Sequence, residues 1–216
     1  MGKAMQIKAG ARSFVRYVGE NRGIVLASVC AIVFVTLLEN VLAEENMKLD
    51  AAAWWLIGEH LRQPLLTPIM ESFSALATPV TLLVVLCVAT AFVPGRRPGW
   101  CTVLNLVLVV ILNQTLKFVI QRPRLDVFRL TEVSGFSFPS GHSMVAMAVF
   151  GLLLWYVWRY EKNPRRRAAL ICLFAFIIAM IGISRIYLGA HYASDVLGGF
   201  CVSMIWLVLY TKVIAP

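Results

Sequence analysis

Six long apolar runs, separated by shorter polar segments, dominate the hydrophobic pattern of the 216-residue chain. A helix that crosses a bilayer needs about 20 predominantly apolar residues. The runs have about that length, and polar residues lie mostly between them rather than on one helical face. The pattern therefore predicts six membrane-spanning helices, at residues 24–43, 75–93, 100–119, 143–160, 168–187 and 193–213.

The segment between the first two runs, residues 50–74, has a different pattern. It opens with Asp50, a plausible helix N-cap, and continues with alanines and two adjacent tryptophans, which suit a membrane interface. Pro64 and Pro68 then interrupt it. We predict an interfacial helix here that lies on the bilayer rather than crossing it.

A basic segment, residues 1–23, precedes the first run, which ends in Val41-Leu42-Ala43 and so resembles a signal-peptidase site. The apolar run is longer than the about 7–15 residues of a signal-peptide core. We therefore expect the first run to be a retained membrane helix.

The composition disfavours several classes of protein. Hydrophobic residues make up 60% of the chain and charged residues 14%, whereas soluble domains average about 45–50% and about 25%. With a mean hydropathy of +0.79, the chain has too little polar surface for a soluble enzyme, a disordered protein or a disulfide scaffold. The five cysteines lie in apolar runs without C-x-x-C spacing, which indicates small packing residues rather than a metal site.

The charge distribution predicts the orientation in the membrane. A formal net charge of +9 would by itself suit nucleic acid, but the hydrophobicity favours a membrane and no nucleic-acid partner. Thirteen of the twenty lysines and arginines lie near the two termini or in the loops after the second and fourth runs. Because Lys and Arg are enriched on the cytoplasmic side, we expect a multi-pass protein of the inner or plasma membrane with both termini in the cytoplasm.

The segment FSFPSGH, residues 136–142, leads directly into the fourth run. Ser140 is a candidate cap, Pro139 stiffens the segment, and Gly141 leaves room for an anion. The free N–H groups of a helix N-terminus, together with a serine hydroxyl, suit a phosphate. An ordinary helix cap explains the segment equally well.

His191 and Asp195 lie four residues apart at the start of the sixth run, so they share one helical face. An aspartate that holds one histidine tautomer leaves the opposite ring nitrogen free as a nucleophile or base. A structural His–Asp pair is the alternative. Arg185 precedes His191 by six residues, across a tight turn, and its guanidinium suits bidentate binding of a phosphate.

Three distant segments thus bring ionisable residues to the outer membrane face. They supply two histidines, one carboxylate and several cations, of which Lys117 lies within apolar sequence. Such residues are costly at the edge of a span and indicate function, although snorkelling explains some long cationic side chains. Histidines with cations favour phosphoryl transfer through a histidine over metal-dependent hydrolysis, which needs more carboxylates. We therefore expect no metal and no cofactor.

Three motifs in these segments resemble the signatures of the type 2 phosphatidic acid phosphatases, the PAP2 superfamily. The family patterns K-x6-R-P, P-S-G-H and S-R-x5-H-x3-D correspond to residues 117–124, 139–142 and 184–195, in the same order. The first motif departs from the pattern because Leu125 follows Arg124, and a second Arg-Pro pair begins at Arg122. Arg124 is assigned by its spacing from Lys117, and Arg122 remains a competing candidate.

The resemblance covers about residues 47–213 and implies one all-α membrane domain over residues 1–216, a six-helix bundle with catalytic motifs on its outer side. It implies that His191 attacks phosphorus to form a phosphohistidine and that Asp195 orients His191. His142 would protonate the leaving oxygen and then activate water. The residues implied to hold the phosphoryl oxygens, without a metal, are Lys117, Arg124, Ser140, Gly141 and Arg185.

The expected function is hydrolysis of a phosphate or diphosphate monoester of a lipid at the extracytoplasmic face. Undecaprenyl diphosphate, phosphatidylglycerol phosphate and phosphatidic acid all fit, and an outward site favours the first, a recycled cell-wall carrier. Two alternatives stay open. One is a phosphotransferase or a vanadate-using oxidase on the same scaffold, and the other is a non-enzymatic transporter of anions or lipids with a cationic pocket.

Overall fold

The computed structural model describes residues 21–45, 47–92, 96–125 and 129–213, and the side chains among these outside 86–99. Most of the predicted basic segment 1–23 lies outside the described residues. Within them, all regular structure is helical. The helices are α2 (Arg22–Leu42), α3 (Lys48–Ala53), η1 (Trp54–His60), α4 (Thr67–Ala75), α5 (Pro79–Phe92), α6 (Arg96–Ile120), α7 (Gly141–Tyr160), α8 (Pro164–Tyr187) and α9 (Ala193–Val213).

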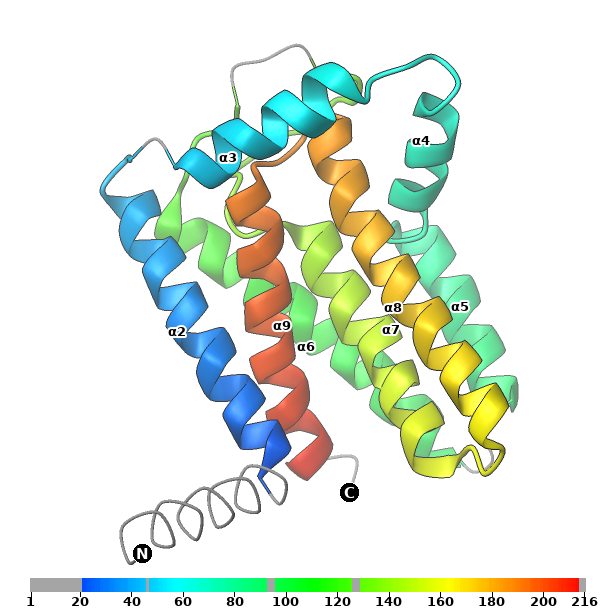
Figure 1. The fold of residues 1–216 in the computed structure, drawn as a ribbon. Helices are drawn as coiled ribbons and strands as arrows, with labels where there is room; N and C mark the ends of the chain where they lie inside the picture. The colour runs from blue at the N-terminus through cyan, green and yellow to red at the C-terminus, as the bar shows by residue number, and fades with distance from the viewer. Residues whose placement is uncertain (1–20, 46, 93–95, 126–128, 214–216) are drawn as a thin grey trace, which may run out of the picture.

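The long helices form a bundle, and α3 lies across one end of it (Figure 1). Helix α7 packs against α6, α8 and α9, while α2 packs against α9. Helix α3 continues directly into the π-helical stretch η1, and together, as residues 48–60, they form the interfacial helix. The interfacial helix contacts α8 and α9 at the C-terminal end of α8 and the N-terminal end of α9 (Figure 1), which are the ends nearest the sequence motifs.

The predicted class, a polytopic all-α membrane bundle, is confirmed. Five helices in the described residues are long and apolar enough to cross a bilayer: α2, residues 100–120 of α6, α7, α8 and α9. A sixth candidate is bent by 63°, where α4 meets residues 79–85 of α5. The predicted second span therefore differs from a straight helix over residues 75–93.

The predicted extent of the interfacial helix is also corrected by the structure. Residues 50–74 do not form one helix, because the π-helical turn ends at His60 and α4 begins only at Thr67. Pro68 lies in the first turn of α4 and Pro79 in the first turn of α5. A proline has no N–H to donate and suits a first turn, so each one begins a new helix rather than continuing the previous one.

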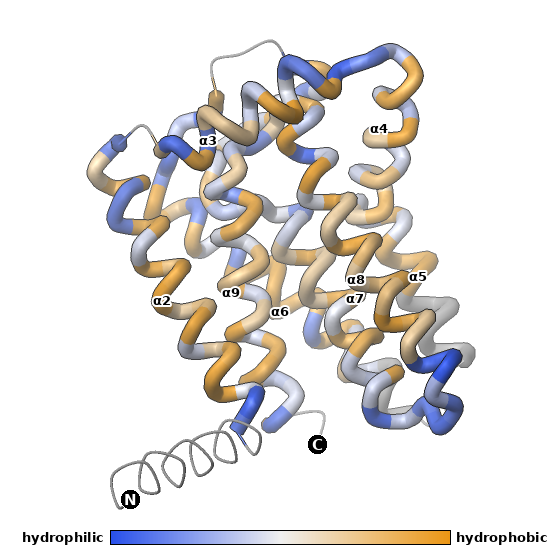
Figure 2. The backbone as a smooth tube through the Cα atoms, in the orientation of Figure 1, coloured by the Kyte–Doolittle hydropathy of each residue, from blue (hydrophilic) through white to orange (hydrophobic). Residues whose placement is uncertain are grey.

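Apolar residues cover the middle of the bundle, and hydrophilic ones gather at its two ends (Figure 2). The side chains of Ile32 and Val35 on α2 are largely exposed, whereas Val109, Met144 and Val149 are buried where α6 and α7 meet. Exposed apolar side chains in the middle of a helix suit lipid contact. Helix α2 packs against α9.

Polar residues inside the spans form bonds between segments, which is the usual role of such residues in membrane bundles. The Asn105 amide donates to the Ala148 carbonyl at 2.7 Å and accepts from Trp206 Nε1 at 2.8 Å. The Asn113 amide donates to the Pro139 carbonyl at 3.2 Å. In the described part of the chain, Cys30, Cys172 and Cys201 are free thiols.

Two glycines let the loop before α7 approach α9 closely. A Cβ at Gly198 would lie 2.7 Å from the ring of Phe138, and one at Gly199 would lie 2.9 Å from the carbonyl oxygen of Ser140. Neither separation is tolerated by real side chains, so glycine is needed at both positions. This contact brings the second motif against the first two turns of α9, where the third motif ends.

Candidate active site

The His191–Asp195 pair lies at the N-terminal end of α9. His191 occupies the turn before the helix, and its Nδ1 lies 3.2 Å from Oδ2 of Asp195. His191 is 3% exposed and Asp195 is fully buried. An ionised carboxylate only accepts hydrogen bonds, so Nδ1 is the donor and Nε2 carries the lone pair. The pair thus has the tautomer that leaves a nucleophilic nitrogen.

The surroundings keep that imidazole uncharged. Burial, as the largest cause, and the cations Arg185 and Lys117 together lower the pKa of His191 to about 4, although the hydrogen bond and charge of Asp195 oppose the shift. A neutral imidazole is the form that can attack an electrophile. At neutral pH the ring is therefore in its reactive form.

Asp195 is held by more donors than His191 alone. Its Oδ2 also accepts from the Ser137 hydroxyl and from the Tyr192 backbone N–H, the latter at 3.0 Å. Its Oδ1 accepts from Nη1 of Arg122 at 2.6 Å. Both carboxylate oxygens are therefore fixed, and the direction of the bond to His191 is fixed with them.

Arg185 lies directly across a turn from His191, as the spacing predicts. Its carbonyl oxygen accepts from the N–H of Ala190 at 3.0 Å and from that of His191 at 3.3 Å. The turn passes through Gly189, whose φ of +73° is the left-handed conformation that commonly ends a helix at glycine. The end of α8 and the histidine therefore form one local unit.

The guanidinium of Arg185 has unused hydrogen-bonding capacity. The side chain is 4% exposed, and its Nη1 donates to the Ser74 hydroxyl of α4 at 2.6 Å. Its Nε is buried, and no hydrogen-bond partner for it exists among the described residues. A buried N–H without an acceptor is costly. A phosphoryl oxygen would provide that acceptor.

Lys117 and Arg124 extend the cationic group. The Lys117 ammonium donates to the Phe136 carbonyl at 2.7 Å. Arg124 donates to backbone carbonyls of Gly135 at 2.9 Å and Ala190 at 2.7 Å, and also to that of Ser134. An ammonium has three donors and a guanidinium five. Both side chains therefore keep N–H groups beyond those that fix them in place.

Ser140 is the N-cap of α7, which confirms the capping prediction. Its Oγ accepts from the Ser143 N–H at 3.4 Å and from the Ser143 hydroxyl at 2.9 Å. These bonds occupy both lone pairs, and the Ser140 hydroxyl hydrogen remains to be donated. A Cβ at the next residue, Gly141, would lie 3.0 Å from Oδ1 of Asn113. The cap and the phosphate-binding interpretation are therefore compatible.

His142 lies in the first turn of α7 and is half-buried. Arg185, His191, Lys117 and Arg124 are all close enough to act on it electrostatically. The structure therefore brings the three motifs together at one end of the bundle, although they are separated by as much as 78 residues in the sequence.

The competing residue Arg122 has a different environment from Arg124. Its Nη1 donates to the Ser194 hydroxyl at 2.7 Å as well as to Asp195, and its Nη2 donates to Asp50 at 3.0 Å. Its guanidinium carbon lies 3.9 Å from the centre of the Tyr192 ring. Arg122 thus faces carboxylates rather than the cationic group, and Arg124 remains the candidate phosphate ligand.

Several residues of this cluster were missed by sequence reasoning. Asp50 is not an N-cap: Met47 occupies that position, and Asp50 lies in the first turn of α3, 9% exposed. Ser74, Ser137 and Ser194 carry no recognisable motif. For Ser137 the one available signal is its position beside the P-S-G-H motif.

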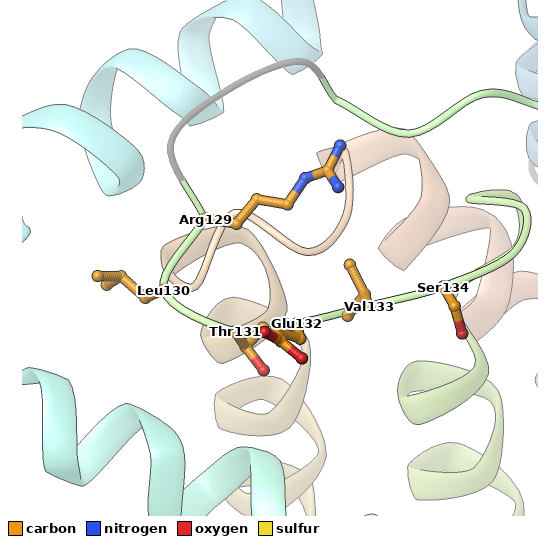
Figure 3. A pocket seen from close by; sticks show the side chains of 6 residues that line it. All are labelled: Arg129, Leu130, Thr131, Glu132, Val133 and Ser134. Atoms are coloured by element: carbon orange, nitrogen blue, oxygen red, sulfur yellow. The ribbon is translucent and has the colours of Figure 1, made fainter.

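Residues 129–134 line a cavity of about 680 Å³ (Figure 3). One of them, Ser134, accepts a hydrogen bond from Arg124 through its carbonyl. No group of three metal-ligating side chains occurs in the described part of the chain. The lining residues are Arg129, Leu130, Thr131, Glu132, Val133 and Ser134.

A membrane helix bundle that gathers a His–Asp pair and a cationic cluster at one end defines a membrane-embedded phosphatase. Residues 98–215 match the model of the PAP2 superfamily. The chain is 34% identical, over 149 residues, to phosphatidylglycerophosphatase B of Bacillus subtilis (strain 168), covering 67% of this chain and 73% of that protein. The chain belongs to the PAP2 superfamily.

Solved structures agree with the fold. A crystal structure of a transmembrane PAP2-type phosphatidylglycerolphosphate phosphatase from Bacillus subtilis is similar with a TM-score of 0.73 and 28% identity, covering 85% of this chain and 94% of that chain. The structure of Aquifex aeolicus LpxE is similar with a TM-score of 0.64 and 24% identity, covering 78% and 98%. The second likeness concerns the fold alone.

Proposed function

We propose that this protein hydrolyses a lipid phosphate or diphosphate monoester through a phosphohistidine at His191. The observation that carries the proposal is the buried, neutral His191, oriented by Asp195 and faced by a cluster of cations with unused N–H groups. A transporter of anions needs the cations but not a fixed histidine tautomer. Membership of a phosphatase superfamily also favours the enzyme over the transporter.

The proposed reaction has two steps. Nε2 of His191 attacks phosphorus, the bond from phosphorus to the lipid oxygen breaks, and His142 gives its proton to that oxygen. The neutral His142 then takes a proton from water, and the resulting hydroxide attacks the phosphohistidine. Free phosphate leaves, and both histidines return to their initial states.

The cationic group stabilises the charge on the transferring phosphoryl group. Positioning and electrostatic stabilisation supply most of the catalysis in phosphoryl transfer. The Nε of Arg185 is the best-supported ligand because it is buried and lacks an acceptor among the described residues. The other proposed ligands are Lys117, Arg124, the Ser140 hydroxyl and the Gly141 N–H.

Phosphatidylglycerol phosphate is the substrate best supported by the similar proteins, since the Bacillus subtilis relatives are named for it. Undecaprenyl diphosphate is the second candidate, on the ground that an outward-facing site suits a recycled cell-wall carrier. The test is phosphate release by purified protein from these two lipids and phosphatidic acid, with an alcohol acceptor added in parallel. We expect fastest release from phosphatidylglycerol phosphate, and a phosphorylated alcohol would indicate a transferase.

Excess chelator is expected to leave the rate within about twofold, because Lys117, Arg124 and Arg185 neutralise the phosphate. The measurement compares initial rates of phosphate release with and without chelator, after passage of the protein through a chelating resin. A loss that one divalent ion restores would contradict the metal-independent mechanism.

We further propose that the site faces the extracytoplasmic side and that both termini are cytoplasmic. The support is the positive-inside bias. Arg159, Lys162 and Arg165 lie at the end of the bundle opposite the candidate site.

Single cysteines at residues 130–134, in a background without the native five, are expected to react with an impermeant maleimide in intact cells. Cysteines at residues 161–163 are expected to react only after permeabilisation. The reverse pattern would put the chemistry on cytoplasmic lipids and would contradict the proposed preference for an outward substrate.

A further inference from the structure

The interfacial helix contributes a buried carboxylate to the outer end of the bundle. Asp50 lies in the first turn of α3 and is 9% exposed, although it belongs to a helix that lies on the surface. Its Oδ1 accepts from the Ser194 N–H at 2.7 Å, and its Oδ2 accepts from the Ser194 hydroxyl at 2.7 Å. A buried charge is retained only where partners compensate it.

Arg122 supplies the compensating charge and joins two carboxylates. Its Nη2 donates to Asp50 at 3.0 Å and its Nη1 to Asp195 at 2.6 Å. The Tyr192 ring covers the guanidinium plane. A planar guanidinium holds two acceptors in a fixed relation, which a lysine ammonium does not. The direction of the Asp195 carboxylate thus depends on Arg122, and that of Arg122 depends on Asp50.

The chain of contacts ends at the reactive histidine. Asp195 joins the two sides of this chain: its Oδ1 accepts from Arg122, and its Oδ2 accepts from Nδ1 of His191. Arg122 is not one of the cations proposed to bind the phosphate, and Asp50 contacts Arg122 and Ser194 instead of the substrate site. Any contribution of these two residues to turnover therefore passes through Asp195. A cation in contact with a carboxylate favours its ionised form, which is the form that holds the Nδ1–H tautomer.

We propose that Asp50 and Arg122 are positioning residues that hold Asp195, and through it His191, in the reactive geometry, which makes the interfacial helix part of the catalytic apparatus. This proposal rests on the proposed function, in which His191 is the nucleophile. It assigns to Arg122 a role distinct from phosphate binding, and it gives α3 a task beyond lying on the membrane.

The first test uses two conservative variants, Asp50→Asn and Arg122→Lys. Each is expected to lower kcat by about 10-fold to 100-fold, a loss of the size seen when a partner that orients a metal-ligating histidine is removed, with KM within about twofold. The matched controls are Glu59→Gln, an exposed carboxylate on the interfacial helix, and Arg167→Lys, an arginine that stacks on Trp158 at the opposite end of the bundle. Both controls are expected to keep the wild-type kcat.

A second test separates positioning from general destabilisation. In an Asp195→Asn background, the Arg122→Lys substitution is expected to cost less than about threefold in residual kcat, because residues that act as one unit are non-additive. An equal loss in both backgrounds would mean that Arg122 merely supports the fold.

Chemical rescue gives a third readout. Asp50, Arg122 and Tyr192 line a cavity of about 420 Å³, which leaves room for free guanidinium to replace a deleted arginine side chain. Guanidinium at millimolar concentration is expected to restore at least tenfold in kcat to Arg122→Ala and nothing to His191→Ala.

Wild-type kcat in both Asp50→Asn and Arg122→Lys would overturn the positioning role and leave the proposed function intact. Full activity of His191→Ala would instead overturn the proposed function. A change confined to KM would assign Arg122 to substrate binding and would also contradict the proposal.

Discussion

His191→Ala is expected to abolish turnover while the helix bundle stays folded. The substitution removes the only atom proposed to attack phosphorus, and no other histidine contacts Asp195 among the described residues. Wild-type protein, quenched on ice during turnover of a phosphorus-labelled lipid, should carry acid-labile, base-stable label. The variant should carry none, and its phosphate release should fall to the level of a blank without enzyme.

The chain offers a matched control for this experiment. It contains three histidines, and His60 is exposed on the interfacial helix, where its Nδ1 lies 2.7 Å from the Trp55 carbonyl. His60→Ala should therefore keep both the label and the rate. Undiminished label on His191→Ala would remove His191 as the nucleophile, and an unchanged thermal unfolding midpoint in detergent would exclude misfolding as the cause of a loss.

The membrane bundle could be predicted because the physical requirement is simple. A span needs a long apolar run, and the runs of α2, α6, α7, α8 and α9 satisfy it without regard to what each helix contacts. The bend between α4 and α5 was not predicted, because hydropathy measures length and composition but not direction. Pro79 was the available signal, since proline favours a first turn over a helix interior.

The candidate site was likewise predictable only in part. Lys117, His142, Arg185 and His191 stand in motifs whose spacing is visible in the sequence, and the structure brings them together. Ser74 contacts Arg185, and Asp50 contacts Ser194, although each pair is more than 100 residues apart in the sequence. Such contacts depend on how helices pack, and single serine or aspartate residues carry no local pattern that reveals them.

His142→Ala is expected to lower kcat on a lipid phosphate by about 10²-fold to 10⁴-fold, the usual contribution of a general acid–base group. An alkoxide is a poor leaving group, so the first step needs the proton that His142 supplies. The position of His142 supports this role, because it lies half-buried in the first turn of α7, close enough to His191 to act on it electrostatically.

The two roles proposed for His142 can be separated with an aryl phosphate, whose leaving group departs without protonation. On that substrate the His142→Ala variant should form the phosphohistidine at nearly the wild-type rate, because only the second step still needs a base. Rapid-quench measurements should then give a burst of released phenol equal in amount to the active sites. Slow turnover should follow, with label accumulated on the protein. Wild-type protein and the His60→Ala control should show less accumulated label, since their second step is fast. Equal losses on alkyl and aryl substrates, without a burst, would mean that His142 acts in neither proton transfer and serves binding or packing instead.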